Sequence, residues 1–277
     1  MRNNPLFTAS AIIVATAILT GCHNNRKSDD ITAGLQNSTA IEFIEFSDTT
    51  VMDMPKMAEI VGKPAYGTII TSGIFPVKLG DTDLKPLQNA ILSAAYGTQD
   101  CTIAEGIEYL SVHSALAEEG DSLTRATLPL KRDSAGSEQY SIISVQTMTN
   151  ALLSFAIYQY IYPYRAAHGM NSTTYVNYYT PEQLLLTASN LFDPSSRAEI
   201  INTLRQAAKD QYASLDTMVD SQEIKSFENF YVSPDNITFV YEPYEIAPYA
   251  AGQVSVTVAP YQLYDYLTPL GKSVFGF

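Results

Sequence analysis

The chain has 277 residues, of which 16 are Lys or Arg and 29 are Asp or Glu, so its formal net charge is −13. This charge excludes a nucleic-acid partner, because neutralising phosphates requires clustered Lys and Arg. Since 46% of the residues are hydrophobic, the chain can bury a core, and it is neither disordered nor fibrous. It contains 19 Tyr and no Trp, and 15 of the tyrosines lie after residue 157.

Residues 1–21 have the pattern of a secretory signal peptide with a lipoprotein cleavage site. Arg2 precedes an apolar run over residues 11–19, and the run leads through Leu-Thr-Gly to Cys22. Small residues before the cysteine fit the signal peptidase, and the thiol receives the lipid. The run is too short to span a bilayer of roughly 30 Å as a helix. We therefore expect a mature chain that begins at a lipidated Cys22 and is held on a membrane by its acyl chains.

Residues 22–40 are polar and are typical of a flexible tether. Within them, Lys-Ser-Asp-Asp at 27–30 resembles the short charged signal that sends some lipoproteins to the outer face of a gram-negative outer membrane. The alternative is a solvated linker. We expect the protein in the cell envelope, lipid-anchored to the outer membrane, with the periplasmic and the surface-exposed locations both open. Once Cys22 is lipidated only Cys101 remains, which excludes an internal disulfide.

Apolar periodicity predicts an N-terminal α+β module over residues 41–135. Alternation predicts strands, and spacings of three and four residues predict helices, the second of which starts with a capping box at Thr102 and Glu105 and ends at Gly120. The expected elements are strands at 41–46 and 66–76 and helices at 81–97 and 102–120.

A polar stretch over residues 119–138 places the internal boundary, so that residues 136–277 form the second half. Its mixed order of strands and helices, with short connections, predicts an α+β fold of antiparallel sheets packed with a few helices. Whether the two sequential halves form one compact unit with a shared core stays open. The expected elements are strands at 141–164, 230–241 and 254–258 and helices at 180–186, 193–208 and 263–267.

Four tyrosines alternate along the predicted strand and therefore share one of its faces: Tyr158, Tyr160, Tyr162 and Tyr164. This face is the candidate binding surface, because Tyr offers a large rigid ring and a hydroxyl, and sugars stack on such rings. The alternative is an inward-facing core with the hydroxyls at its rim. The other candidate binding residues are His168, Tyr244 and Tyr249.

The segment 230–261 resembles the carboxy-terminal block of the RsiV-type domain. That domain occurs in the extracellular part of the anti-sigma factor RsiV and beside the catalytic domain of some polysaccharide deacetylases. The resemblance is most specific in Tyr-Glu-Ile-Ala-Pro-Tyr-Ala-Ala-Gly at 244–252. Residues 164–169 look like the family's Tyr…Gly-Ala-His-Gly segment, although Ala166 stands where the family tends to have Gly, and residues 184–192 look like its Leu-x-x-Leu-Phe helix.

In that family the clearest known role is protein recognition, because the extracellular part of RsiV binds lysozyme. The resemblance implies a non-catalytic envelope lipoprotein that binds a lysozyme-class hydrolase or a similar protein, or a cell-wall glycan. A purely structural partner in a lipoprotein assembly is a further possibility.

An enzyme or accessory module acting on envelope polysaccharide is the competing hypothesis. It would require paired carboxylates, a metal set, or a nucleophile with its base. The three histidines (His23, His113 and His168) have no metal-binding spacing, and no Gly-x-Ser-x-Gly motif occurs. We therefore expect no catalytic residues, no metal and no cofactor, and His168 is the one residue that we would mutate to test catalysis.

Overall fold

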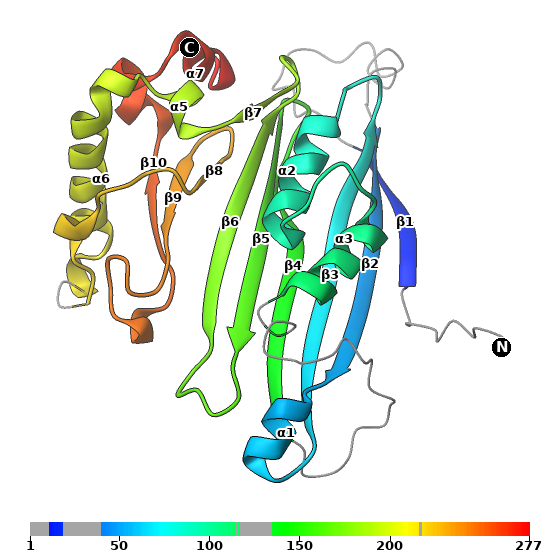
Figure 1. The fold of residues 1–277 in the computed structure, drawn as a ribbon. Helices are drawn as coiled ribbons and strands as arrows, with labels where there is room; N and C mark the ends of the chain where they lie inside the picture. The colour runs from blue at the N-terminus through cyan, green and yellow to red at the C-terminus, as the bar shows by residue number, and fades with distance from the viewer. Residues whose placement is uncertain (1–10, 19–39, 115, 117–134, 216–217) are drawn as a thin grey trace.

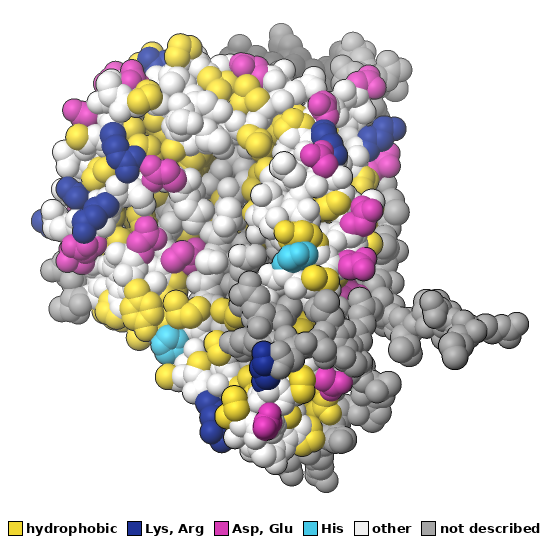
Figure 2. All heavy atoms as spheres, viewed as in Figure 1, with side chains coloured by type: hydrophobic (Ala, Val, Ile, Leu, Met, Phe, Trp, Pro, Cys, Tyr) yellow, Lys and Arg dark blue, Asp and Glu magenta, His cyan; other side chains and the backbone are white. Residues whose placement is uncertain are grey.

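The protein has a mixed α+β fold built on one large and one small sheet (Figure 1). The structure, a computed structural model, describes residues 11–18, 40–114, 116, 135–215 and 218–277. Among these residues no helix has the length and apolar character needed to cross a membrane. Figure 2 shows acidic and basic side chains interspersed on the visible face, so the charge there forms no patch of one sign.

Seven strands form the large sheet in their order along the chain. Neighbours are antiparallel, except that β3 and β4 are parallel. This one parallel pair departs from the expected antiparallel sheets, and it requires a long crossover, part of which is helical. The strands are β1 (Ala11–Ile18), β2 (Ala40–Asp53), β3 (Ala65–Leu79), β4 (Ala135–Met148), β5 (Leu152–Tyr162), β6 (Met170–Tyr179) and β7 (Leu184–Leu186).

Strand β1 lies within the segment predicted to be a signal peptide. Its residues pair with β2 in antiparallel register, from Ala11 opposite Ser47 to Ile18 opposite Ala40. This pairing belongs to the unprocessed chain, and removal of residues 1–21 stays a prediction. Cys22 and residues 23–39 of the predicted tether lie outside the described residues.

Two helices of the crossover cover one face of the large sheet (Figure 1). Helix α2 (Lys85–Tyr96) buries an apolar stripe that includes Leu87 and Ile91, and it ends at Gly97, where φ is 75°. A left-handed residue at this position favours glycine. The predicted helix is therefore confirmed, with its glycine cap.

Helix α3 (Ile103–His113) begins with the predicted capping box. Thr102 Oγ1 accepts a hydrogen bond from the Glu105 amide, and the Glu105 carboxylate accepts one from the Thr102 amide at 2.7 Å. The helix ends at His113, where the backbone turns extended at Ser114, and not at the predicted Gly120, which lies outside the described residues.

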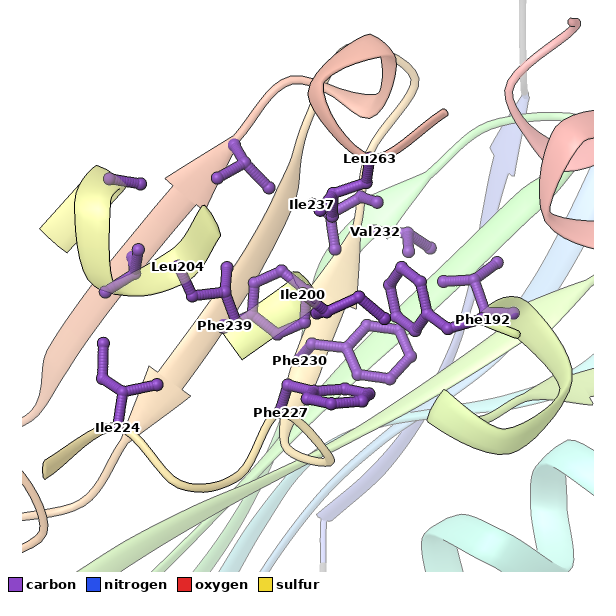
Figure 3. Close-up of a cluster of buried hydrophobic side chains, with 14 of the residues drawn as sticks. Phe192, Ile200, Leu204, Ile224, Phe227, Phe230, Val232, Ile237, Phe239 and Leu263 are labelled. Atoms are coloured by element: carbon purple, nitrogen blue, oxygen red, sulfur yellow. The ribbon is translucent and has the colours of Figure 1, made fainter. Parts of the chain in front are cut away.

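The small sheet has the order β10-β9-β8 and packs with helix α6 (Arg197–Gln211) around a second core. Figure 3 shows side chains of α6, including Ile200 and Leu204, meeting a group of phenylalanine rings. The Phe192 and Phe227 rings lie 5.6 Å apart at 85°, the edge-to-face arrangement that aromatic pairs favour. The three strands are β8 (Phe230–Val232), β9 (Ile237–Tyr241) and β10 (Val254–Val258).

Two asparagine side chains join the small sheet to the large one. Asn177 of β6 donates to the Phe230 carbonyl at 2.7 Å and accepts from the Val232 amide at 3.2 Å. Asn229 accepts from the Tyr175 amide at 3.3 Å and donates to the Thr173 carbonyl at 2.8 Å. Each side-chain carboxamide therefore makes the paired hydrogen bonds that a neighbouring strand's backbone would otherwise make where the two sheets meet.

The two predicted halves share one sheet and one core. Strand β3 pairs with β4 across the predicted boundary, with Tyr66 opposite Gly136. The core under α2 combines Phe43 and Ile91 from the first half with Phe155 and Tyr178 from the second. The α+β architecture is confirmed, and its halves form one compact unit.

Two predictions in the second half were wrong or incomplete. Residues 180–186 form a turn followed by strand β7, and not a helix, because the leucines pair with the end of β6. Strand β6 was not predicted at all. The remaining elements are α1 (Pro55–Val61), α5 (Ala188–Leu191), α7 (Pro269–Val274) and 3-10 turns at Pro194–Ser196, Ala213–Leu215, Ser221–Glu223, Tyr249–Ala251 and Pro260–Tyr266.

Candidate binding site: an aromatic band

An aromatic band lies on the face of the large sheet opposite α2. Gln159 on β5 donates to the Ala94 carbonyl of α2, so its neighbours Tyr158 and Tyr160 point to the other face. We use the name aromatic band for a connected set of six side chains: Tyr140, Tyr158, Tyr160, His168, Tyr244 and Tyr249.

The band begins with two stacked tyrosines on adjacent strands. Tyr140 and Tyr160 are register partners on β4 and β5, and their rings stack with centroids 5.3 Å apart. The Tyr140 hydroxyl donates to the Glu138 carboxylate at 2.6 Å, which raises the pKa of Tyr140 to about 12. Cross-strand aromatic pairs of this kind stabilise a sheet and hold the rings in one orientation.

Gly169 lies directly against the end of the Tyr160 ring, so a larger residue at this position would displace the ring or the loop. A Cβ added to Gly169 would lie 2.3 Å from the Tyr160 ring, well inside van der Waals contact. The glycine of the Ala-His-Gly segment is therefore explained by close approach of backbone to ring. This contact fixes the loop that carries His168 beside the sheet.

His168 connects the sheet to the loop that follows β9. Its ring stacks on Tyr249 with centroids 3.9 Å apart. Its Nδ1 donates to the Gly169 carbonyl at 2.9 Å, and the same carbonyl accepts from the Tyr249 hydroxyl at 2.9 Å. Its Nε2 lies 3.2 Å from the Tyr244 hydroxyl, which donates to it. Both ring nitrogens are thus engaged, so His168 orders the band and is not placed as a free base.

Tyr244 forms the exposed end of the band. It is 58% exposed and has φ of 74°, a left-handed conformation that is unfavourable for a residue with a Cβ. Three hydrogen bonds hold this turn. The Tyr244 amide donates to the Ala247 carbonyl, the Glu245 amide donates to the Glu242 carbonyl, and the Glu242 amide donates to the Glu245 carboxylate. Backbone strain that the surroundings enforce is often found at functional sites.

Glu242 lies below the band and fastens the loop to the edge of β6. Its Oε1 accepts from the Thr173 amide at 2.7 Å and from Gln253 Nε2 at 3.1 Å. Its Oε2 is buried and has no hydrogen-bond partner among the described residues. Burial raises the pKa of the Glu242 carboxyl above its ordinary value of 4.5, and the nearby Glu245 raises it further.

The centre of the band offers rings and hydroxyls to solvent. Tyr158 and Tyr160 are half-buried, and within the described chain neither hydroxyl makes a hydrogen bond. Burial raises the pKa of Tyr158, and Tyr160, Tyr249 and Glu242 raise it further, which shows that these groups lie near one another. The rings of Tyr158 and Tyr160 are therefore neither fully buried nor fully exposed, and their role in binding stays a prediction.

Two of the candidate tyrosines lie outside the band. Tyr162 shares its face of β5, but its hydroxyl donates to the Ala166 carbonyl at the end of the sheet. Tyr164 follows the end of β5, and its ring lies near Lys63 and Arg165, at 5.9 and 5.2 Å. The left-handed residue of this loop is Arg165, with φ of 65°, so Ala166 needs no glycine conformation.

Sequence reasoning did not select Tyr140 or Gly169 as site residues. Tyr140 belongs to a predicted strand, but only its pairing with β5 shows that it faces Tyr160. Gly169 was part of the segment that resembles the family, but the need for a glycine there comes from its contact with Tyr160 on strand β5.

A pocket of about 770 Å³ adjoins the band at Tyr244. It lies between α6 and two loops, and its lining includes Lys209, Asp220, Glu223 and Glu245. The described part of the chain contains no group of three His, Cys, Asp or Glu that could hold a metal ion. The chemistry that this region offers is ring stacking and hydrogen bonding beside a polar hollow.

Comparison with known proteins finds two solved structures of similar fold and a family model that matches part of the chain. The fold is similar to a DUF3298 family member from Bacteroides fragilis, with a TM-score of 0.66 and 20% identity over 86% of this chain and 98% of that one. It is also similar to a DUF3298 family protein from Pseudomonas aeruginosa, with a TM-score of 0.53 and 15% identity over 96% of both chains. No protein with curated annotation matches the sequence. Residues 189–261 match the family model described as "Protein of unknown function (DUF3298)".

Proposed function

We propose that the protein is a non-catalytic lipoprotein of the cell envelope that binds a cell-wall glycan on the aromatic band. The observation that carries this proposal is the pair of half-buried rings of Tyr158 and Tyr160, whose hydroxyls make no hydrogen bond within the described residues. The faces of sugar rings stack on aromatic side chains, and their hydroxyls require partners such as phenols. The band is mounted on paired strands, so its rings are held in place before a ligand arrives.

The dimensions of the region also suit a chain-like ligand. The band runs from Tyr140 on the sheet to Tyr244, where the pocket of about 770 Å³ begins. Ligand pockets of small molecules measure roughly 300–1,000 Å³, so this hollow is large enough for one or two sugar rings. A glycan would lie across the rings and place one end in the pocket.

Binding of soluble cell-wall glycan fragments to the purified protein tests the proposal, with calorimetry as the readout. We expect Tyr160→Ala to weaken binding by about tenfold, because a stacked ring contributes about 0.5–1.5 kcal/mol and its hydroxyl about as much again. The matched control is Tyr261→Ala, since Tyr261 is 71% exposed and lies outside the band. Equal losses in both variants, or no binding by the parent protein, would contradict the proposal.

The envelope location has its own test. Metabolic labelling with a fatty acid should mark the protein, and Cys22→Ala should abolish the label and leave the precursor unprocessed. Protease treatment of intact cells then separates the two faces of the outer membrane, because a surface-exposed protein is digested and a periplasmic one is protected.

A protein ligand of the lysozyme class is the second candidate, and it would extend to this chain the role implied by the resemblance to the RsiV-type domain. The net charge of −13 favours a basic partner. Addition of a lysozyme in place of the glycan distinguishes the two: glycan binding requires the rings of the band, whereas association driven by diffuse charge weakens with salt and survives Tyr160→Ala.

A further inference from the structure

Three carboxylates lie around the aromatic band, and within the described residues none of them forms an ion pair, although Lys209 lines the adjoining pocket together with Glu245. Glu138 bonds Tyr140 at one end of the band, while Glu242 and Glu245 lie beneath the loop at the other. In the described chain the ion pairs join other residues (Lys85 to Asp100, Arg197 to Glu228 and Lys225 to Glu223), so none involves these three carboxylates.

Glu242 is the most unusual of the three. Two hydrogen bonds satisfy Oε1, whereas Oε2 is buried and unpartnered in the described structure. Its neighbours are the rings of Tyr158 and Tyr175, whose phenols respond to its charge, and the like-charged Glu245. A buried carboxylate without a counter-charge is costly, and a cation brought close to it in a medium of low polarity is strongly attracted.

We propose that the ligand of the aromatic band carries a protonated amine, as in a glycan that contains hexosamine units with free amino groups. This inference rests on the proposed function and names the chemical class of its ligand. An ammonium group is attracted to the faces of Tyr rings. The Glu242 carboxylate lies beside the ring of Tyr158, because it accepts from the amide of Thr173, which is the register partner of Tyr158 on the next strand. The rings bind the cation from the outside, and the Glu242 carboxylate beneath them supplies the missing counter-charge.

Two probes of equal length test this inference: an oligomer of glucosamine and the matching oligomer of N-acetylglucosamine. They differ in the N-acetyl group, which replaces the protonated amine of each sugar unit by an uncharged amide. At a pH at which the amine is protonated, we expect the purified protein to bind the amine oligomer at least about tenfold more tightly. Glu242→Gln should remove most of this preference. The readout is the ratio of the two affinities, so that any change in binding common to both oligomers cancels.

The control is Glu199→Gln, which removes the same charge from an exposed position on α6, far from the band. It accounts for non-specific attraction between an acidic protein and a cationic oligomer, because both variants have the same net charge. A preference that both variants lose equally would overturn the inference, since bulk charge would then explain it.

The outcomes also separate this inference from the proposed function. Equal binding of both oligomers, with loss in Tyr160→Ala, would overturn the amine requirement and support glycan binding. No binding of either oligomer or of cell-wall fragments would overturn both. Circular dichroism of each variant confirms that it is folded before binding is compared.

Discussion

At the scale of single residues, the contact between Gly169 and Tyr160 decides whether the two parts of the aromatic band meet. A Cβ at this position would lie 2.3 Å from the Tyr160 ring, so either the ring or the loop has to move. We expect Gly169→Ala to lower the free energy of unfolding by about 1–3 kcal/mol, the usual cost of overpacking. Because the loop also carries His168, ligand binding should fall as well.

Chemical denaturation of the variant, followed by circular dichroism, checks the loss of stability. Gly252→Ala is an informative comparison: no atom lies within 4 Å of its added Cβ, but its φ is 69°, so any loss there reports backbone strain alone. An unchanged denaturation midpoint for Gly169→Ala would show that the loop yields without cost.

Glu242 makes stability depend on pH in a defined direction. Because burial raises the pKa of its carboxyl in the folded state, the folded protein holds the proton more tightly than the unfolded chain. Its contribution to stability is therefore fully present below the ordinary value of 4.5 and is lost as the pH rises through the folded pKa. Glu242→Gln cannot lose a proton, so its stability relative to the parent should increase over this window.

Urea midpoints of the parent and of Glu242→Gln, measured at several pH values from 4 upward, check this dependence. The diagnostic quantity is how the difference between the two urea midpoints changes with pH. A packing defect in the variant would instead shift its midpoint by a similar amount at every pH. A difference that falls with pH would contradict the raised pKa.

At the scale of elements, Asn177 links the two sheets as a substitute for strand backbone. Removing its carboxamide leaves the Phe230 carbonyl and the Val232 amide without those bonds in a buried place. An unsatisfied buried group costs about 1–3 kcal/mol, so Asn177→Ala should reduce the free energy of unfolding by about 2–4 kcal/mol. Thermal unfolding checks it against Asn236→Ala, whose exposed side chain lies in the turn between β8 and β9.

An element could be predicted from the sequence when residues close together in the chain are enough to determine it. Helix α3 was predicted to begin at Thr102 because its cap involves residues three positions apart. Strand β6 was missed because it contains polar residues whose partners lie far along the chain. The Thr173 amide donates to Glu242, and the Asn177 side chain bonds to β8. The leucines at 184–186 resemble a helix turn, but their pairing with the end of β6 makes them a strand.

At the scale of the whole molecule, the chain should unfold as one unit, because the boundary predicted near residue 135 runs through a continuous sheet. A fragment of residues 136–277 would expose the β3 edge of β4 and the side chains of Phe155 and Ile157 that pack under α2. We expect a single unfolding transition for the full chain, coincident by tyrosine fluorescence and circular dichroism, and no folded state for the fragment. Two separate transitions would contradict the shared core.

The sequence by itself determined the helix caps at Gly97 and Thr102 and most of the strands, and it indicated five of the six residues of the aromatic band. These features depend on neighbouring residues, whose periodicity and spacing can be recognised directly. Only the tertiary structure decided that Tyr140 stacks on Tyr160, that Gly169 approaches its ring, and that Glu242 lies beneath the band. The reason is that strand register and side-chain burial are set by contacts between distant segments, which no local pattern specifies.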